Sequence, residues 1–113
     1  MNKKCLFCRI IKKEIPASIV LENEHLIAFK DIQPKDNTHI LIVPKSHTDN
    51  LNTFNLNDES TKSIFKAIKD LGKLLKENHY KIQVNNGAKS GQEIPHLHFH
   101  FVSNSKLKST GLS

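Results

Sequence analysis

The stretch His96-Leu97-His98-Phe99-His100-Phe101-Val102 alternates three histidines with large apolar residues. A period of two is that of a β-strand and not that of a helix. On such a strand the three imidazoles project from one face, and Leu97, Phe99 and Phe101 project from the other. Residues that share a face lie about 6.5–7 Å apart along the strand. Neighbouring imidazoles on this strand therefore reach the same phosphate-sized group.

The row of histidines has a structural and a functional interpretation. A single histidine on a strand is usually a half-buried side chain with a satisfied hydrogen bond. Three in strict alternation contribute little to a sheet, because Val or Thr packs better at such positions. Histidine is a metal ligand, a base and a nucleophile near neutral pH. The stretch therefore predicts metal binding or phosphate-transfer chemistry.

Composition argues against several classes of protein. A chain of 113 residues is the size of one domain with its own core, and it has no apolar run long enough to cross a membrane. The N-terminus is charged and lacks the apolar stretch of a secretion signal, which predicts a cytoplasmic protein. The net charge is +6, yet Arg9 is the single arginine. No aromatic residues are interleaved with the lysines, so a specific nucleic-acid partner is not expected.

Periodicity along the rest of the chain predicts an α+β fold. About five strands form an antiparallel sheet, and one short N-terminal helix and one long helix pack against it. The short helix spans Cys5–Lys13, and the long helix follows Asn57 as its N-cap. The expected strands are Ile19–Leu21, Leu26–Phe29, Thr38–Val43, Tyr80–Val84 and the histidine stretch, with Thr38–Val43 buried on both faces.

The long helix carries an apolar stripe that is expected to pack on the sheet and to have no function of its own. Its members are Ile64, Phe65, Ile68, Leu71, Leu74 and Leu75. The segment from 103 to 113 shows no periodicity. We expect this tail either to be flexible or to contact a partner.

With these segments the chain resembles the histidine triad (HIT) superfamily, whose motif is His-x-His-x-His with apolar x. Within it the chain is similar to the histidine-triad nucleotide-binding proteins, the purine nucleoside phosphoramidases. The further segments that match in order and spacing are CLFCRII (5–11), EIP (14–16), AFKDI (28–32), THILIVPKSH (38–47) and VNNG (84–87). The resemblance implies a HIT-like fold and a single domain over residues 1–113.

The resemblance implies an enzyme that hydrolyses nucleoside 5′-phosphoramidates at the P–N bond of the α-phosphate. It places the nucleophile at His98, which forms a nucleotidyl-histidine intermediate that water then releases. The backbone carbonyl of His96 would hold the other ring nitrogen. His100 would donate to a phosphate oxygen, and His39 on a neighbouring strand would lie beside the same group. This chemistry needs no cofactor.

The resemblance also implies a site for a purine nucleotide such as AMP or GMP. Asp31 would accept hydrogen bonds from the ribose hydroxyls. Asn85 and Gln92 would contact the phosphate or the leaving group, from a loop whose glycines let backbone N–H groups approach an anion; both are also ordinary turn residues. Glu93 stands where relatives often carry Ser, which leaves the leaving-group preference open. The base pocket would consist of Leu6, Phe7, Ile10, Phe29 and Ile32, although these apolar residues fit a plain core equally well.

The motif Cys5-x-x-Cys8 has three interpretations from the residues alone: a metal site, a redox pair, or two cysteines that pack in a core. The resemblance adds two histidines, and the set Cys5, Cys8, His47 and His96 then makes a closed structural zinc site. Ideal alternation points His96 to the same face as His98. We therefore expect Pro95 to bend the chain and turn His96 aside.

Other functions stay open at this point. One alternative is hydrolysis of dinucleoside polyphosphates or adenylyl adducts, and another is a nucleotide-binding sensor or scaffold with incidental turnover. A third is a zinc-dependent or redox protein that uses the two cysteines. Relatives are homodimers whose sheets join edge to edge and whose C-terminal segments reach the partner's active site, so a homodimer is expected. Residues 105–113 lack the tryptophan and prolines of animal relatives.

Overall fold

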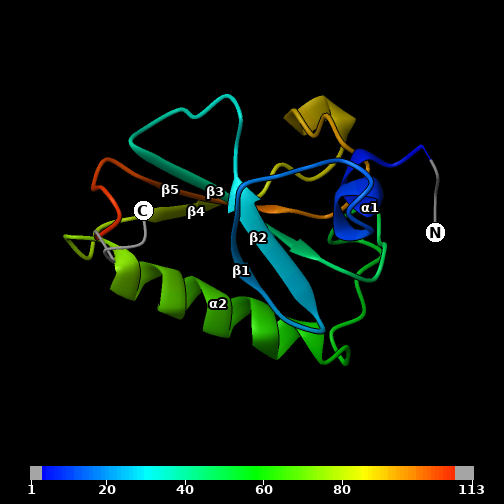
Figure 1. Ribbon diagram of the computed structural model, residues 1–113. Helices are drawn as coiled ribbons and strands as arrows, with labels where there is room; N and C mark the ends of the chain where they lie inside the picture. The colour runs from blue at the N-terminus through cyan, green and yellow to red at the C-terminus, as the bar shows by residue number, and fades with distance from the viewer. Residues whose placement is uncertain (1–3, 109–113) are drawn as a thin grey trace.

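The strands form one antiparallel five-stranded sheet in the order β1-β2-β3-β5-β4, and a helix packs on each face (Figure 1). The computed structural model describes residues 4–108. Its elements are α1 (Leu6–Ile11), β1 (Ile19–Glu22), β2 (Leu26–Lys30), β3 (Thr38–Pro44), α2 (Ser60–Leu74), β4 (Lys81–Gln83), the 3-10 helix η1 (Ala88–Ser90) and β5 (Phe99–Ser103). The predicted α+β class and the antiparallel sheet are confirmed.

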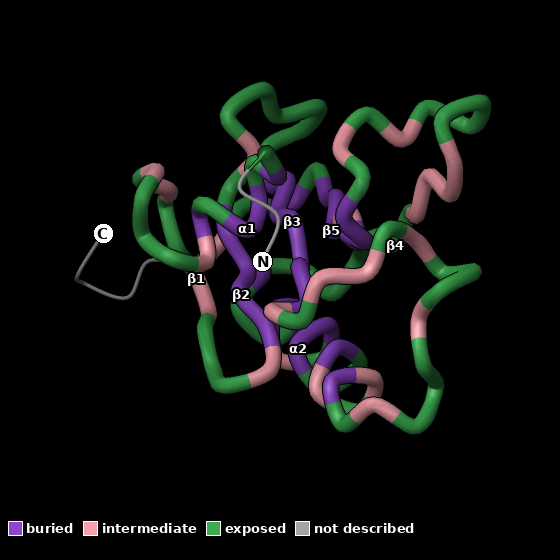
Figure 2. The backbone as a smooth tube through the Cα atoms, turned by 90° about the vertical axis from the view of Figure 1, so that its right-hand side faces the viewer, coloured by how far each residue is buried: buried purple, intermediate pink, exposed green. Residues whose placement is uncertain are grey.

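β3 is the central strand, and all seven of its residues are buried. Its alternate side chains point to opposite faces of the sheet. Figure 2 shows the buried stretches running along β2, β3 and β5. The prediction that this strand is buried on both faces is confirmed.

Two apolar clusters hold the helices to the sheet. The α2 cluster contains Leu26, Ala28, Ile40, Ile42, Ile64, Ala67, Ile68, Leu71, Leu75, Leu97, Phe99 and Phe101. The α1 cluster, on the opposite face, contains Cys5, Phe7, Cys8, Ile10, Ile27, Phe29, Leu41 and Val43.

α1 is shorter than predicted because the chain turns sharply after it. The helix ends at Ile11, and Lys13 adopts a φ of 66°, which a right-handed helix cannot contain. At the other end the Cys5 side chain accepts the N–H of Cys8, as the side chain of an N-cap residue does. The two cysteines are therefore held close together at the N-terminal end of α1.

α2 begins at Ser60 with Glu59 at the N-cap, so the prediction of Asn57 as the N-cap is wrong. The Asp58 carboxylate accepts the N–H of Ser60 at 2.8 Å and satisfies one of the first helical donors. The N–H of Asn57 donates to the side chain of Asn55 instead, in a turn before the helix.

The prediction that Phe65 and Leu74 of the apolar stripe pack on the sheet is wrong. Phe65 is 62% exposed and Leu74 is 38% exposed. Successive helix residues lie about 100° apart, so each of the two points well away from its buried neighbour, Ile64 or Leu75. Within residues 4–108, neither helix is long and apolar enough to cross a membrane.

β5 begins at Phe99, so the prediction that the strand starts at His96 is wrong. Phe99 pairs with β3, whereas the N–H of Leu97 donates to the carbonyl of Thr48 in the loop after β3. The apolar side of the motif is as predicted, because Leu97, Phe99 and Phe101 all join the α2 cluster. Two of the three histidines therefore lie in the segment that leads into the strand.

β4 is limited to Lys81–Gln83, and Tyr80 and Val84 of the predicted strand lie outside it. Its ladder with β5 runs from the Lys81–Val102 pair to the Gln83–His100 pair. Tyr80 instead stacks its ring on Phe101, with centroids 4.6 Å apart.

The segment after β5 returns along the end of α2. Leu107 pairs with Leu75, and the N–H of Lys76 donates to the carbonyl of Lys106 at 2.9 Å. Residues 106 and 107 are therefore paired with the end of α2, and the expectation that the tail contacts a partner stays a prediction. Residues 109–113 lie outside the described residues.

The two faces of α2 give a test of this packing. Leu71→Ala removes a fully buried side chain from the α2 cluster and is expected to lower the free energy of unfolding by about 2–5 kcal/mol. Phe65→Ala changes an exposed side chain and is expected to shift it by about 0.5 kcal/mol or less. Urea unfolding measures both, and equal losses would contradict the assignment of the two faces.

Candidate active site and metal centre

Three imidazoles gather on the face of the sheet that α1 covers. His39 comes from β3, His98 from the segment before β5, and His100 from β5. The ring centroids of His98 and His100 lie 5.1 Å apart, and those of His39 and His100 lie 5.2 Å apart. The structure therefore brings together the three residues that the sequence predicts to be catalytic.

One ring nitrogen of His98 is held by the backbone. Nδ1 of His98 lies 2.7 Å from the carbonyl oxygen of His96. A carbonyl only accepts, so Nδ1 carries the proton and donates it. A neutral ring then has a lone pair on Nε2. The buried ring of Phe7 packs edge-on against His98, with centroids 5.0 Å apart, and limits how far the imidazole can turn.

The other two imidazoles form a directed chain of hydrogen bonds. The backbone N–H of Lys35 donates to Nδ1 of His39 at 3.1 Å, so the proton of a neutral His39 is on Nε2. Nε2 of His39 lies 2.9 Å from Nδ1 of His100. His100 accepts this bond at Nδ1, which leaves Nε2–H of His100 as a free donor.

Burial keeps both members of this chain neutral. Burial lowers the pKa of His100 to about 4, and the nearby rings of His98 and His39 and the charge of Lys35 act in the same direction, while Asp31 opposes them. Burial also lowers the pKa of His39, against the carboxylate of Asp31. Neutral rings are what this chain requires, because each then has one donor and one acceptor.

Asp31, His39 and His100 also bring three potential metal ligands within 4.8 Å of one another. Nε2 of His39 lies 3.5 Å from the Asp31 carboxylate. The proton that Lys35 imposes on Nε2 occupies the nitrogen that a metal would need. The geometry therefore favours a hydrogen-bonded group over a metal site here.

The loop 85–92 is shaped by its own amide side chains. Gly87 and Gly91 have φ values of 94° and 89°, which L side chains rarely adopt. The Asn85 carboxamide donates to the Ser90 carbonyl at 2.7 Å. The Gln92 carboxamide accepts the N–H of Gly87 at 2.8 Å. The side chains of Asn85 and Gln92 thus hold the backbone of this loop in place.

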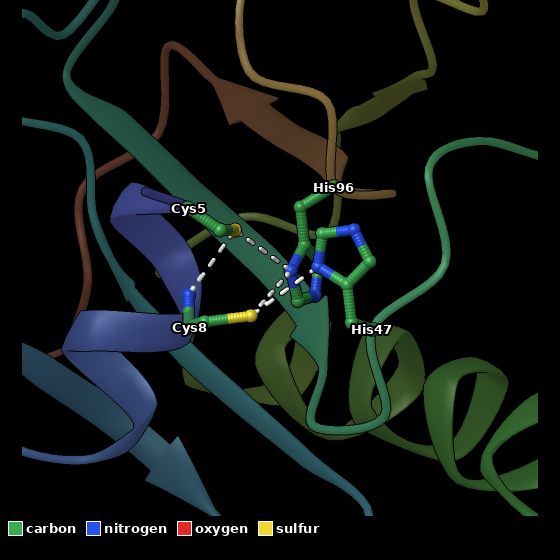
Figure 3. A group of neighbouring side chains, drawn as sticks. All are labelled: Cys5, Cys8, His47 and His96. Atoms are coloured by element: carbon green, nitrogen blue, oxygen red, sulfur yellow. Dashed lines mark hydrogen bonds between the residues drawn. The ribbon is translucent and has the colours of Figure 1, made fainter. Parts of the chain in front are cut away.

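A second group of side chains brings four metal-ligand atoms together (Figure 3). Sγ of Cys5 lies 3.3 Å from Nδ1 of His96. Sγ of Cys8 lies 3.2 Å from Nδ1 of His47 and 3.6 Å from Nδ1 of His96. The cysteines come from the start of α1, His47 from the loop after β3, and His96 from the segment before β5. Three distant parts of the chain meet at this point.

These distances fit a tetrahedral ion. With Zn–S of about 2.3 Å and Zn–N of about 2.0–2.1 Å, ligand atoms in a tetrahedron lie about 3.3–3.8 Å apart. Nε2–H of His96 donates to the Pro44 carbonyl at 2.8 Å, and Nε2 of His47 lies 2.9 Å from the Asp49 carboxylate. Both rings therefore turn Nδ1 toward the centre, as outer partners of metal-bound histidines do. The four residues could bind a metal.

His96 belongs to both groups of side chains. Its N–H donates to the Ile94 carbonyl at 2.8 Å in a tight turn centred on Pro95. The turn directs the ring toward the cysteines, while the carbonyl of the same residue accepts from His98. We call Cys5, Cys8, His47 and His96 the metal group. A displacement of this group would therefore move the carbonyl oxygen that accepts from His98 and orients its ring.

The five residues predicted to form the base pocket occupy two environments. Phe7, Ile10 and Phe29 are buried in the α1 cluster, and the ring of Phe7 contacts those of His96 and His98. Leu6 is 40% exposed and Ile32 is 94% exposed.

Sequence reasoning missed the groups that orient the rings. The N–H of Lys35 and the carbonyl of Pro44 belong to the backbone, which every residue carries, so residue types contain no signal for them. The Asp49 carboxylate lies two residues after His47, and this His-x-Asp spacing is a signal that could have found it.

The half-buried His100 predicts a pH dependence of stability. Between pH 6.5 and about 4, His100 stays neutral in the folded protein but is protonated in the unfolded chain. The unfolded state then binds more protons, so the free energy of unfolding falls as the pH falls through this window. His100→Asn is expected to lose less stability than wild type between about pH 7 and about pH 4.5. Urea unfolding at several pH values measures both proteins. Equal losses of unfolding free energy in wild type and His100→Asn would contradict the prediction.

The sequence and the fold are both similar to those of known proteins. The model of the HIT domain matches residues 12–107. The adenosine 5′-monophosphoramidase of Saccharomyces cerevisiae is 38% identical over 109 residues, 96% of this chain and 68% of that protein. A HIT family hydrolase from Legionella pneumophila superposes with a TM-score of 0.84 at 34% identity, covering 95% of this chain and 98% of that one. A histidine triad nucleotide-binding protein from Candida albicans gives a TM-score of 0.81 at 34% identity, covering 94% and 81%. The chain therefore belongs to the HIT domain family.

Proposed function

We propose that this protein is a hydrolase that cleaves the P–N bond of nucleoside 5′-phosphoramidates at the α-phosphate. The observation that carries the proposal is the hydrogen bond from Nδ1–H of His98 to the His96 carbonyl at 2.7 Å, which leaves Nε2 free to attack. The similarity to the yeast adenosine 5′-monophosphoramidase supports this choice of substrate.

The reaction proceeds in two displacements at phosphorus. Nε2 of His98 first attacks the α-phosphorus, so that a bond to the ring forms and the bond to the amine breaks. The amine leaves with the electron pair and takes a proton from water. A second water then attacks the nucleotidyl-histidine and gives a proton to the hydroxide that the first water left. The bond to His98 breaks, and the nucleotide leaves with the ring neutral again. A covalent intermediate divides one difficult step into two easier ones.

His100 and His39 assist both displacements. Nε2–H of His100 donates to a non-bridging oxygen of the phosphate and stabilises charge that develops there. His39 holds Nδ1 of His100 at 2.9 Å, so the donor needs no reorientation during the reaction. His39 thereby acts through His100.

The nucleoside lies across β2 and β3. Asp31, at the end of β2, accepts hydrogen bonds from the ribose hydroxyls, and its carboxylate is 21% exposed, which leaves it accessible to a ligand. Asn85 and Gln92 contact the phosphate or the leaving group from their loop. The purine base packs against apolar side chains of α1 and of the segment around the end of β2, namely Leu6, Phe7, Ile10, Phe29 and Ile32.

We further propose that Cys5, Cys8, His47 and His96 bind a structural zinc ion. Bound zinc supplies a cross-link and no chemistry of the reaction. The four side chains tie α1 and the loop after β3 to the segment that leads into β5. Such a site needs reduced thiols, which the cytoplasm maintains, and we place the protein there.

The sheet edge offers a surface for a homodimer. β4 is an edge strand, and its three residues are exposed. A second copy that adds its own strand at this edge would extend the sheet through backbone hydrogen bonds. We propose that two copies join there.

Replacing the nucleophile tests the reaction. His98→Ala is expected to lower release of AMP from adenosine 5′-phosphoramidate by at least about a thousandfold, because no nitrogen remains to attack phosphorus. Calorimetry is expected to show that the variant still binds AMP. His79→Ala, which changes an exposed histidine, is the matched control. Turnover that survives in His98→Ala would exclude the covalent route.

Replacing a metal ligand tests the zinc site. Wild type is expected to carry one zinc per chain by native mass spectrometry, and His47→Ala is expected to lose it and unfold at a lower urea concentration, because the cross-link is gone. His25→Ala, outside the metal group, is expected to retain the ion. Wild type without stoichiometric zinc after purification free of chelators would make the proposal wrong.

A further inference from the structure

Cys5 and Cys8 meet at the start of α1 in a geometry that also suits a disulfide bond. Both cysteines are reduced, and they are the only two in the chain. The N–H of Cys8 donates to Sγ of Cys5 at 3.3 Å (Figure 3), and the two sulfur atoms lie within 4.8 Å of each other. Residues three apart in a helix have Cα atoms about 5 Å apart, a separation that disulfides span. Rotation of the two side chains can therefore join the sulfur atoms.

A disulfide and a bound metal exclude each other at these two cysteines. Zinc is bound by thiolates, and a disulfide contains none. Sγ of Cys5 lies 3.3 Å from Nδ1 of His96, and Sγ of Cys8 lies 3.2 Å from Nδ1 of His47. Sulfur atoms that turn toward each other also turn away from these imidazoles. Oxidation would therefore leave the metal group with its two histidines alone.

The first turn of α1 must open before the cysteines react. Cys5 is 2% exposed and Cys8 is 1% exposed, so both are shielded from an oxidant while the turn is closed. α1 has six residues, and a helix of this length is not stable without tertiary contacts. The contacts that hold it are those of the α1 cluster and of the metal group. A bound metal would therefore slow the opening and protect the thiols.

The same turn of α1 contacts the proposed nucleophile. Phe7 lies between the two cysteines, and its ring packs against those of His98 and His96, with centroids 5.0 Å and 5.9 Å apart. The carbonyl of His96 also accepts from Nδ1 of His98. Opening of this turn would therefore remove a ring that packs on His98 and free the residue that orients it.

The loop after β3 connects the metal group to the loop after β4. His47 lies in the first of these loops, and the carbonyl of Asp49 accepts from the Gln92 carboxamide at 2.6 Å. The N–H of Leu51 donates to the side chain of Asn86 at 2.7 Å. Release of His47 would therefore loosen the loop from which the phosphate is proposed to be contacted.

We propose that Cys5 and Cys8 are a reversible oxidation site whose disulfide releases the metal and weakens nucleotide binding. The proposal rests on the proposed metal and nucleotide sites and names what regulates them. The oxidant is a small disulfide such as oxidised glutathione. Disulfides of cytoplasmic proteins are usually transient and redox-sensing, which fits a reversible site of this kind.

The oxidation consists of two thiol–disulfide exchanges. The thiolate of one cysteine attacks a sulfur atom of oxidised glutathione, so that a mixed disulfide forms and one glutathione leaves. The second cysteine attacks the protein sulfur of the mixed disulfide, so that the Cys5–Cys8 bond forms and the second glutathione leaves. The protein loses two electrons and the oxidant gains them. Two protons from water complete the two glutathione thiols, and Zn²⁺ is released.

Treatment of the zinc-loaded protein with excess oxidised glutathione tests the oxidation site without a substrate. Wild type is expected to lose both thiols and two hydrogen atoms of mass and to release its zinc, as measured by thiol titration, intact mass spectrometry and a zinc indicator. Hydrogen exchange over residues 85–98 is expected to accelerate at least about tenfold. Reductant with added zinc is expected to reverse these changes.

Calorimetry with AMP tests the effect on the nucleotide site. Oxidised wild type is expected to bind AMP at least about tenfold more weakly than reduced, zinc-loaded wild type, which is the size of effect that supporting residues of a metal site have. Reduced wild type stripped of zinc by a chelator is expected to show the same fast exchange over residues 85–98. Slow exchange in the stripped protein would contradict the proposed coupling.

Cys8→Ser is the matched variant, because it keeps Cys5 but cannot form the intramolecular bond. Its mass is expected not to fall by two hydrogen atoms. Its exchange over residues 85–98 is expected to be fast before any oxidation, since it lacks one metal ligand. Slow exchange in this variant would show that the metal group does not hold the loop.

The outcomes separate this proposal from the proposed function. If folded wild type keeps both thiols, or carries glutathione in place of the disulfide, the oxidation site is excluded and the hydrolase proposal stands. If the disulfide forms but AMP binds equally well, control of the nucleotide site is excluded. If reduced wild type binds no AMP, the nucleotide site fails, and with it the proposed regulation. Wild type that never carries zinc would make both the metal site and this proposal wrong.

Discussion

The hydrogen bond between Nδ1 of His98 and the carbonyl of His96, 2.7 Å long, makes one peptide group part of two sites. The turn at Pro95 sends the His96 ring toward Cys5 and Cys8. The carbonyl of the same residue then fixes which nitrogen of His98 is free. Because both depend on one short segment, a movement of the four candidate metal ligands would also move His98, the proposed nucleophile. The proposed zinc cross-link would in this way maintain the geometry of the proposed attack on phosphorus.

Burial also keeps two of the imidazoles, those of His39 and His100, neutral. β3 has no exposed residue, and the packed sheet around it lowers the pKa of His100 to about 4. A neutral ring has one donor and one acceptor, so the chain from Lys35 through His39 to His100 has a single direction. The same burial stabilises the sheet and leaves the proton of a neutral His100 on Nε2, where it can be donated. Core packing and the protonation state of His100 therefore depend on the same burial.

The sheet separates the parts of the candidate site by strand. Phe29 lies in β2 and Asp31 directly follows that strand, His39 and His100 lie in β3 and β5, and Lys81 and Gln83 lie in β4. In the proposed function, this order places the nucleoside on the β2 side and the α-phosphate beside the imidazoles.

The sequence by itself determined the element types, the burial of Thr38–Val43 and the apolar face of the histidine motif, because these follow from local periodicity. Residue types also singled out His98, His100 and the Cys5–Cys8 pair as candidates. The tertiary structure decided where β5 begins, which way His96 points, and that Phe65 faces solvent. It also supplied the backbone groups of Lys35 and Pro44 that orient the rings. These features depend on which segments meet across the sheet. Strand pairing and backbone hydrogen bonds produce no periodic pattern of residue types, so the sequence alone does not predict them.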